Sequence, residues 1–283
     1  GVSRSPTRPS EGGLTEEEVE VLKASSFVNR KLFLPWVDVD LQETFRFSEP
    51  WSDPDGLLSL SEPQRTKLQG WRRPSEFIQG KPQMIANVNP YSIRQARRRH
   101  DLITDCSFVA SLCIASAFER RFHKQLITSI IYPQASNAST IPTPSRKGVY
   151  NPDGKYLVKL FINGVGRKVV VDDRLPTGEK GRLLCSSSTD KTELWVSIIE
   201  KAYLKVNGGY DFPGSNSGID LYALTGWLPE QQIFFEEHRE SKSRQSRGPQ
   251  PLDNYEKAGR VWERLLSAHE FGDCLITVAT SEI

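Results

Sequence analysis

Cys106 is the residue of this sequence whose position best suits nucleophilic chemistry. It precedes apolar residues that recur at helical spacing from Phe108 to Phe118, and no Gly or Pro follows before Pro133. In the first turn of a helix, unpaired backbone N–H groups and the positive end of the helix dipole stabilise a thiolate. The sequence therefore predicts a long, largely buried helix with Cys106 in its first turn and with Asp105 accepting amide hydrogens near the N-cap. On the residues alone, a catalytic Cys106 and a buried apolar Cys106 both stay open.

The other cysteines show no sign of chemistry. Cys113 lies two helical turns after Cys106 on the apolar face, so we expect a core residue there. Cys185 and Cys274 fall in a loop and in a β-like run, without an activating neighbour. No C-x-x-C pair occurs, which indicates neither a metal site nor a disulfide framework. We expect free thiols in a reducing compartment.

A nucleophilic cysteine needs a base, usually a histidine, within hydrogen-bond reach. His123, His238 and His269 each stand among charged residues, so we expect ordinary surface positions for them. His100 ends a basic run that starts at Arg97, and this run is either a solvated loop or a substrate-channel or regulatory patch. The residues alone identify no convincing base.

Further elements must position these residues. Asn163-Gly164 is a turn signal between two strand-like runs, 156–162 and 167–171, and predicts a β-hairpin. Periodicity and composition predict the later elements: helices over about 191–206 and 255–268, a Gly-rich loop over 207–217 and a strand over 273–280.

The beginning of the chain has a different composition. Residues 1–13 and about 240–251 are polar and lack apolar anchors, so we expect the most mobile parts there. Thr15 and Glu18 form a capping-box pattern that predicts a short helix to about Ser26. Aromatic residues among many prolines over 27–90 predict short elements in an extended segment that is pinned to a larger body.

The overall charge excludes some classes of function. The 283 residues include 37 basic and 35 acidic side chains, which leaves a net charge of +2 and none of the single-sign field of a nucleic-acid or membrane-surface binder. No apolar run approaches the roughly 20 residues of a membrane span, and residues 1–13 do not resemble a signal peptide. We expect a soluble intracellular protein. The first residue is Gly and Met84 is the only Met, so we also expect a piece of a longer protein.

A family resemblance begins at the nucleophile. Residues 104–112 (TDCSFVASL) resemble the active-site helix of calpain-family cysteine proteases, in the branch that contains calpain-seven and the fungal PalB proteases. That branch has Ser after the nucleophile where conventional calpains have Trp. Four further segments agree in order and spacing: 126–134 (LITSIIYPQ), 154–176 (GKYLVKLFINGVGRKVVVDDRLP), 193–213 (ELWVSIIEKAYLKVNGGYDFP) and 224–229 (LTGWLP). The resemblance covers roughly residues 15–280.

The resemblance implies an α+β, papain-like fold with Cys106 as nucleophile on a helical first subdomain. It also implies that the triad His and Asn come from a β-rich second subdomain beyond Ile283, so the piece alone is expected to be inactive. The division that follows is a linker at 1–13, an extended segment at 14–90, the first subdomain at 91–235, and an insertion, a helix and the start of the second subdomain at 236–283.

The oxyanion hole departs from the family pattern. Calpain-like proteases place a Gln six residues before the nucleophile, whereas position 100 here is His. Gln95 stands in a context like that of the family's Gln, followed by an apparent insertion over 96–100. Either Gln95 still reaches the site, which we favour, or His100 donates instead, or the gene model is wrong at this point.

Two further roles are implied by the resemblance. Glu200 matches a Ca²⁺ ligand of conventional calpains, but Arg97 replaces the partner acid, so Ca²⁺ dependence is left open and Glu200 is equally a surface acid paired with Lys201 or Lys205. Gly214 and Ser215 match the loop that binds an extended peptide by its main chain. The alternative for this loop is a plain Pro-Gly turn.

The function implied is that of an intracellular calpain-like cysteine endopeptidase acting in limited proteolysis. Members of this branch are linked to endosomes, to the ESCRT machinery and, in fungi, to ambient-pH signalling. The partners expected are therefore protein substrates and ESCRT components, and no nucleic acid, because the basic runs 97–100 and 244–247 are short. The alternative is a non-catalytic scaffold with the same fold.

Overall fold

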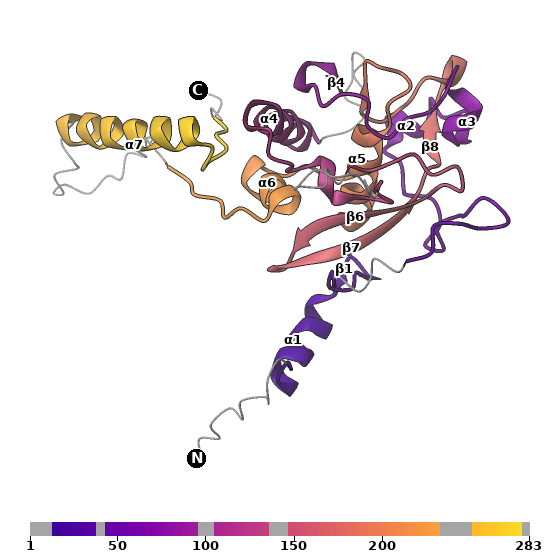
Figure 1. The fold of residues 1–283 in the computed structure, drawn as a ribbon, viewed down its shortest axis with the longest axis horizontal. Coiled ribbons are helices and arrows are strands. Elements are labelled where there is room, and N and C mark those ends of the chain that lie inside the picture. Colours follow the sequence, from indigo (N-terminus) through magenta and orange to yellow (C-terminus); the bar gives the residue numbers. More distant parts are fainter. Residues whose placement is uncertain (1–12, 38–42, 96–104, 136–146, 233–250, 279–283) are drawn as a thin grey trace, which may run out of the picture.

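A computed structural model describes residues 13–37, 43–95, 105–135, 147–232 and 251–278. The segments expected to be mobile, 1–13 and 240–251, lie outside the described residues except for the last residue of each. The basic run 97–100 and His238 also lie outside them. Figure 1 shows a body of packed helices and strands from which the first and the last long helices project.

An antiparallel three-stranded sheet forms the centre of the body. Its strands are β5 (Ile131–Tyr132), β6 (Lys155–Ile162) and β7 (Val165–Asp172), in that order. The predicted hairpin is confirmed, with Ile162 opposite Val165. Both turn residues have positive φ, 50° at Asn163 and 80° at Gly164. That conformation matches the twist of the flanking strands, which explains why the Asn-Gly pair fixes the register.

Helix α5 (Trp195–Val206) contacts β6 and β7, and every one of its residues is buried. The helix was predicted to start near residue 191 and starts four residues later. The reason is local: the Asp190 carboxylate accepts hydrogen bonds from the backbone and hydroxyl of Thr192, so residues 190–193 form a turn instead.

Helix α4 (Cys106–Phe122) carries the predicted nucleophile as its first residue, which confirms the expected helix and its start. It ends where the carboxylate of Glu119 accepts hydrogen bonds from three successive backbone amides, those of residues 126–128, at 3.0–3.1 Å. Helix α6 (Ser217–Thr225) packs against α4 and β6 and was not predicted. Asn216 caps it by accepting from the amide of Ile219.

The segment ahead of α4 consists of short elements, as predicted. Helix α1 (Glu16–Ser25) starts with the predicted Thr15–Glu18 capping box. The other elements of this segment are β1 (Phe27–Val28), β2 (Lys31–Leu32), α2 (Glu62–Arg65), β3 (Gly70–Arg72), α3 (Pro74–Phe77), the 3₁₀ helix η2 (Pro90–Ser92) and β4 (Ile93–Arg94).

Pairing and packing join this segment to the body. Strand β3 pairs with β8 (Leu175–Thr177), and β4 pairs with β9 (Ser187–Ser188). Phe33, Leu58, Leu60 and Met84 belong to the same hydrophobic core as α5 and the sheet. Two 3₁₀ helices complete the described elements of the body: η3 (Thr128–Ile130) and η4 (Glu179–Gly181). The structure is therefore α+β, and the proposed division at residues 14, 91 and 236 stays a prediction.

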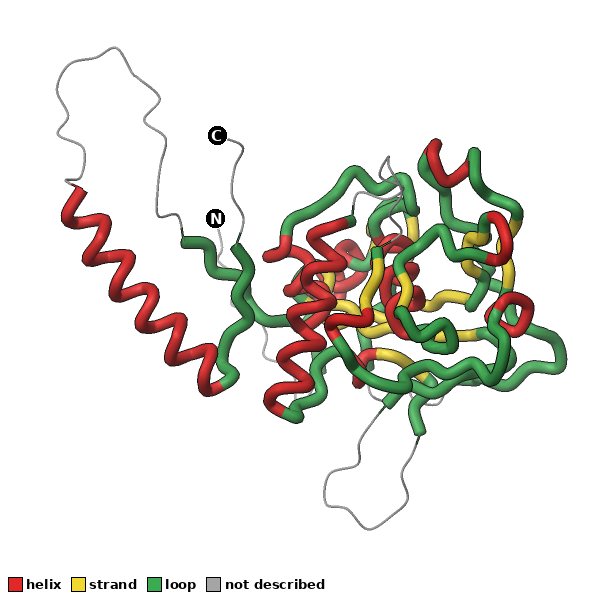
Figure 2. Tube along the Cα trace, turned by 90° about the horizontal axis from the view of Figure 1, so that it is seen from above, coloured by secondary structure: helices red, strands yellow, loops and turns green. Residues whose placement is uncertain are grey.

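Helix α7 (Pro251–Phe271) is longer than the predicted helix over 255–268, and Figure 2 shows it standing beside the body. The strand predicted over 273–280 is wrong for its described part, because residues 273–278 form no strand. A strand needs a hydrogen-bonded partner, and within the described residues none lies beside this segment. Instead, Thr277 contacts Ser217 of α6, with 2.7 Å between the hydroxyl oxygens. In the part of the chain that the structure describes, no helix is long and apolar enough to cross a membrane.

Candidate functional site at the start of helix α4

Cys106 is the most accessible of the four thiols. It is exposed and free, whereas Cys113 and Cys274 are partly covered and Cys185 is buried. Burial raises the pKa of the Cys113 and Cys274 thiols, and it raises that of Cys185 well above its usual value. Cys106, in contrast, lies where the first-turn amides of α4 are unpaired within the helix. Exposure therefore distinguishes Cys106 from the other three thiols.

Asp105 does not cap the helix, contrary to the sequence-based expectation. Its side chain makes no hydrogen bond to the first-turn amides. It is fully buried, and Oδ1 accepts a hydrogen bond of 3.1 Å from Nε2 of Gln95. Oδ2 accepts none from any N–H or hydroxyl group of the described residues. Its hydrogen-bonding neighbour is the carboxyl group of Glu200.

Glu200 lies beneath the nucleophile's helix, not on the surface. It is fully buried and accepts from the amide of Ser186 with both oxygens, at 3.1 and 2.9 Å. Burial and the adjacent charge of Asp105 raise the pKa of Glu200 well above its usual value. Burial raises the pKa of Asp105 as well, and two carboxyl groups share a hydrogen bond only when one of them holds a proton, so the pair shares one proton.

The expected partners of Glu200 bind elsewhere. Lys201 binds Asp172 at 2.5 Å and Lys205 binds Asp53 at 2.6 Å, and both lysines are buried. The surface-acid interpretation of Glu200 is therefore wrong. The calcium interpretation also lacks support, because the described residues contain no group of three or more acidic, His or Cys side chains that could hold a metal ion.

A chain of polar side chains joins α4 to the loop over 207–216. The hydroxyl of Ser107 lies 3.1 Å from that of Ser215, and Ser215 also donates to the buried carboxylate of Asp220. Gly214, next to Ser215, has φ +111°, a conformation that favours glycine. The structure thus brings Cys106, Ser215 and Gly214 into one region.

Sequence reasoning missed Ser107, Tyr203 and Asp220 in this region. The hydroxyl of Tyr203 donates to Asp220 at 2.5 Å and lies 3.2 Å from the oxygen of Ser215. One signal was available for Asp220, because a single acid between Ile219 and Leu221 indicates a buried acid with partners.

The described histidines lie at the other end of α4. His123 follows the last residue of the helix and is exposed, and His269 lies 3.1 Å from Arg121. A helix rises 1.5 Å per residue, so roughly 25 Å along the axis separates Cys106 from this end. Neither histidine can take a proton from Cys106, and His100 and His238 lie outside the described residues.

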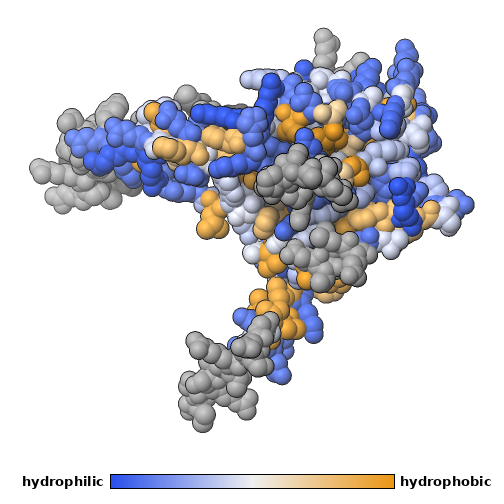
Figure 3. All heavy atoms as spheres, viewed as in Figure 1, coloured by the Kyte–Doolittle hydropathy of each residue, from blue (hydrophilic) through white to orange (hydrophobic). Residues whose placement is uncertain are grey.

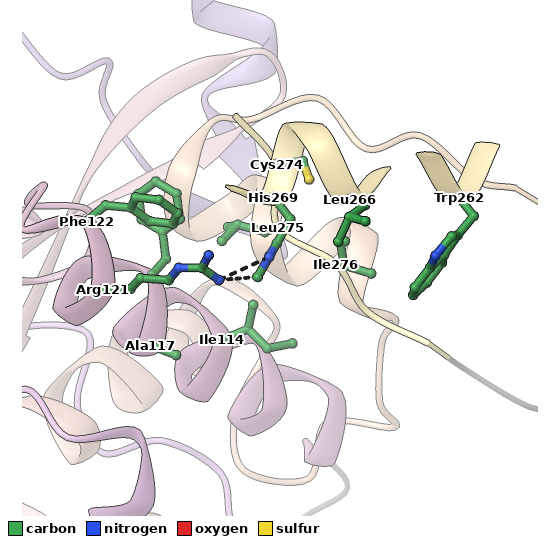
Figure 4. A pocket seen from close by; sticks show the side chains of 11 residues that line it. Ile114, Ala117, Arg121, Phe122, Trp262, Leu266, His269, Cys274, Leu275 and Ile276 are labelled. Atoms are coloured by element: carbon green, nitrogen blue, oxygen red, sulfur yellow. Dashed lines mark hydrogen bonds between the residues drawn. The ribbon is translucent and has the colours of Figure 1, made fainter. Parts of the chain in front are cut away.

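The hollow at that end of α4 is distinct from the Cys106 region. It has a volume of about 460 Å³. Figure 4 shows its walls: α4 contributes Ile114, Ala117, Arg121 and Phe122, while α7 and the segment after it contribute Trp262, Leu266, His269, Cys274, Leu275 and Ile276. Its lining is apolar apart from the Arg121–His269 pair. It offers packing surface and no catalytic group for Cys106.

Comparisons with known proteins find relatives of this chain among the cysteine proteases. The model of the calpain family of cysteine proteases matches residues 51–281. Calpain-7 of Mus musculus is 54% identical over 217 residues, which cover 77% of this chain and 25% of that protein. The calpain-like protease palB/cpr-8 of Neurospora crassa is 36% identical over 290 residues, covering 99% of this chain and 28% of that protein. The calpain-like protease palB of Emericella nidulans is 33% identical over 297 residues, which cover 99% of this chain and 31% of that protein. The chain thus spans between 25% and 31% of the length of these relatives.

Proposed function

The chain belongs to the calpain family of cysteine proteases, in the branch of calpain-7 and PalB, and from this premise we propose that it is the nucleophile-bearing part of a cysteine endopeptidase. The observation that supports the proposal is the position of Cys106, an exposed thiol at the N-terminus of a largely buried helix. A thiolate is favoured there by the helix dipole and by unpaired amides.

The proposed chemistry is acyl transfer. A histidine takes the proton of the Cys106 thiol, the sulfur attacks a peptide carbonyl carbon, and the histidine returns the proton to the leaving amine. Water then releases the acyl group from the sulfur. The backbone N–H of Cys106 and the side-chain amide of Gln95, with His100 as the alternative, would stabilise the oxyanion. We propose that His and Asn of the triad come from sequence that this chain does not contain, since the described histidines lie far from Cys106.

An extended protein segment is the proposed substrate. Its main chain would run along Gly214 and Ser215, because a glycine lets two backbones approach closely. Endosomal location, ESCRT partners and a part in pH signalling are proposed from the branch alone. No step is assigned to Ca²⁺.

A non-catalytic scaffold is the second candidate. The observation that favours it is the distance of His123 and His269 from the nucleophile. Activity of the whole protein separates the two: Cys106→Ala should abolish cleavage with the fold intact if the protein is a protease, whereas a scaffold would show no cleavage to lose.

Site-resolved alkylation tests the nucleophile in this chain. With iodoacetamide, Cys106 should be labelled faster than Cys113, Cys185 and Cys274, as followed by mass spectrometry of the peptides. Equal labelling of Cys106 and Cys113 in the folded chain would contradict the proposal.

Turnover by the same sample tests the missing base. Residues 1–283 alone should not hydrolyse an unstructured protein, because a thiolate without an imidazole cannot protonate the leaving amine. Turnover that His100→Ala removes would make the histidine of the basic run the base and overturn this part of the proposal.

A further inference from the structure

Ser107, the residue after the proposed nucleophile, is tied to the proposed substrate loop. Its Oγ lies 3.1 Å from Oγ of Ser215, which is partly buried. Ser215 in turn donates to Oδ1 of Asp220, a residue with no exposed surface in the first turn of α6. Three side chains therefore join the start of α4 to the loop, which lies 108 residues later in the chain, and to α6, which directly follows the loop.

The protons of this chain have one consistent arrangement. Tyr203 donates its hydroxyl proton to Oδ1 of Asp220 at 2.5 Å, and Ser215 donates to the same oxygen. Ser215 then accepts from Ser107, because its single hydroxyl proton is already donated to Asp220. Tyr203 itself is held by stacking on Phe108 of α4, with ring centroids 3.9 Å apart. One carboxylate oxygen thus orients both hydroxyl groups that reach it.

The second oxygen of Asp220 makes this acid costly to bury. Oδ2 is buried and has no hydrogen-bond partner among the described residues. An unsatisfied buried oxygen costs stability, and an apolar side chain in its place would avoid that cost. What the carboxylate provides in return is a fixed position for the hydroxyl groups of Ser215 and Tyr203.

We propose that Asp220 is a positioning residue: through Ser215 and Ser107 it holds the Gly214–Ser215 backbone at a constant separation from Cys106. Gly214 has φ +111° and lies outside regular secondary structure, so a side-chain anchor is what restrains this backbone. The inference rests on the proposed function, because the separation matters only if Cys106 attacks a peptide that lies along this loop.

The test compares a small and a peptidyl electrophile on Cys106 of the whole chain. Iodoacetamide reports the reactivity of the thiol alone. A dipeptidyl chloromethyl ketone also reports how tightly its peptide part binds, measured as the reagent concentration that gives half of the maximal labelling rate. Asp220→Ala should raise that concentration about fivefold, because the loop loses the hydrogen bond that Ser215 donates to Asp220. The iodoacetamide rate should stay within about twofold, because neither the thiol nor the α4 amides change.

Two further variants serve as controls. Asp220→Asn keeps an acceptor oxygen for Ser215 and Tyr203, so it should restore peptidyl binding to near the wild-type value. Thr225→Ala removes a hydrogen bond at the other end of α6, from its hydroxyl to the carbonyl of Leu221, and should leave peptidyl binding unchanged. A general weakening of α6 would affect Thr225→Ala and Asp220→Ala alike.

The outcomes separate this inference from the proposed function. If wild-type Cys106 is not labelled preferentially by iodoacetamide, the proposed nucleophile is wrong. If wild-type Cys106 is labelled preferentially, two results would overturn the positioning role of Asp220. Either Asp220→Ala binds the peptidyl reagent as the wild type does, or its labelling by iodoacetamide and by the peptidyl reagent slows equally. Should near-ultraviolet circular dichroism show that Asp220→Ala is unfolded, Ser215→Ala breaks the same link from the loop side. It must then show the same selective loss for the role to stand.

Discussion

Three buried ionisable side chains of α5 each have a specific partner. Lys201 and Lys205 bind the carboxylates of Asp172 and Asp53, and Glu200 pairs with Asp105 below the nucleophile. Unpaired, any of them would cost several kcal/mol of stability. The pairs therefore fix the position of α5 relative to its neighbours, because a shift of the helix by one residue would break all of them at once.

Asp173 provides a pH test of this description. It is buried beside Arg73, and burial raises its pKa from 3.8 to about 6 although Arg73 acts to lower it. Between these values the folded state keeps a proton that the unfolded state releases, so the free energy of unfolding falls as the pH rises from about 4 to about 6. Relative to Asp173→Asn, the wild type should lose on the order of 3 kcal/mol over this range, measured by urea unfolding at each pH.

Asp190→Asn is the matched control for this pH effect. Hydrogen bonds from Thr192 lower the pKa of Asp190, so its contribution to stability is present at neutral pH and is lost as the pH falls. Relative to Asp190→Asn, the free energy of unfolding of the wild type should therefore rise as the pH rises, which is opposite to the change expected relative to Asp173→Asn. If Asp173→Asn and wild type kept a constant difference from pH 4 to pH 7, the raised pKa would be refuted.

At the scale of elements, α6 is fixed at both of its ends. Its N-terminus is capped by Asn216 and tied to the loop by Asp220. Its C-cap is Gly226, with φ +74°, and a Cβ built there would meet the ring of Phe161 on β6 at 2.8–3.0 Å. The glycine thus allows both the left-handed turn and the close approach of α6 to the sheet.

A pair of glycine substitutions separates these two roles. Gly226→Ala should destabilise by about 2–5 kcal/mol, the sum of left-handed backbone strain and overpacking against Phe161. Gly164→Ala in the hairpin has nearly the same φ, +80°, but open space around the added methyl group, and should cost only about 1–2 kcal/mol. Urea midpoints measure both losses. Equal losses would show that the contact with Phe161 does not matter.

At the scale of the whole molecule, the segment ahead of residue 51 is part of the same folded body. The family match starts at residue 51, yet Phe33 is 2% exposed and belongs to the common core. Arg167 of β7 is fully buried and donates to the hydroxyl of Ser26 and the carbonyl of Phe33, at 2.7 and 3.0 Å. Figure 3 shows apolar side chains where α1 meets the body, so the contact there is only partly covered.

Substitutions at two apolar positions test this integration. Phe33→Ala should lower the free energy of unfolding by about 3–5 kcal/mol within one cooperative transition, because a buried aromatic ring is lost from the shared core. Val21→Ala on α1 is the control, since Val21 is 65% exposed and its loss should cost at most about 0.5 kcal/mol. Two separate transitions in the wild type, with Phe33→Ala shifting only one, would show an independent domain.

The sequence by itself determined the features that depend on neighbouring residues. Helical spacing after Cys106 predicted α4 and its start, Asn163-Gly164 predicted the hairpin, and Thr15 with Glu18 predicted the start of α1. Each of these signals acts within a few residues, so one segment contains all the information that it needs. The family resemblance likewise followed from short motifs in a fixed order.

Only the tertiary structure decided the partners of the buried polar groups. Asp105 stands at the N-cap of α4, but its side chain meets Gln95 and Glu200 instead of the helix amides, and Asp220 accepts hydrogen bonds from Ser215 and Tyr203. The end of α4 depends on how Glu119 binds the following amides, and the segment after α7 forms no strand in its described part because no strand lies beside it. A carboxylate accepts a hydrogen bond from whichever donor the fold brings to it, and for Glu200 and Asp105 that partner lies 95 residues away along the chain. No local pattern records such a pairing.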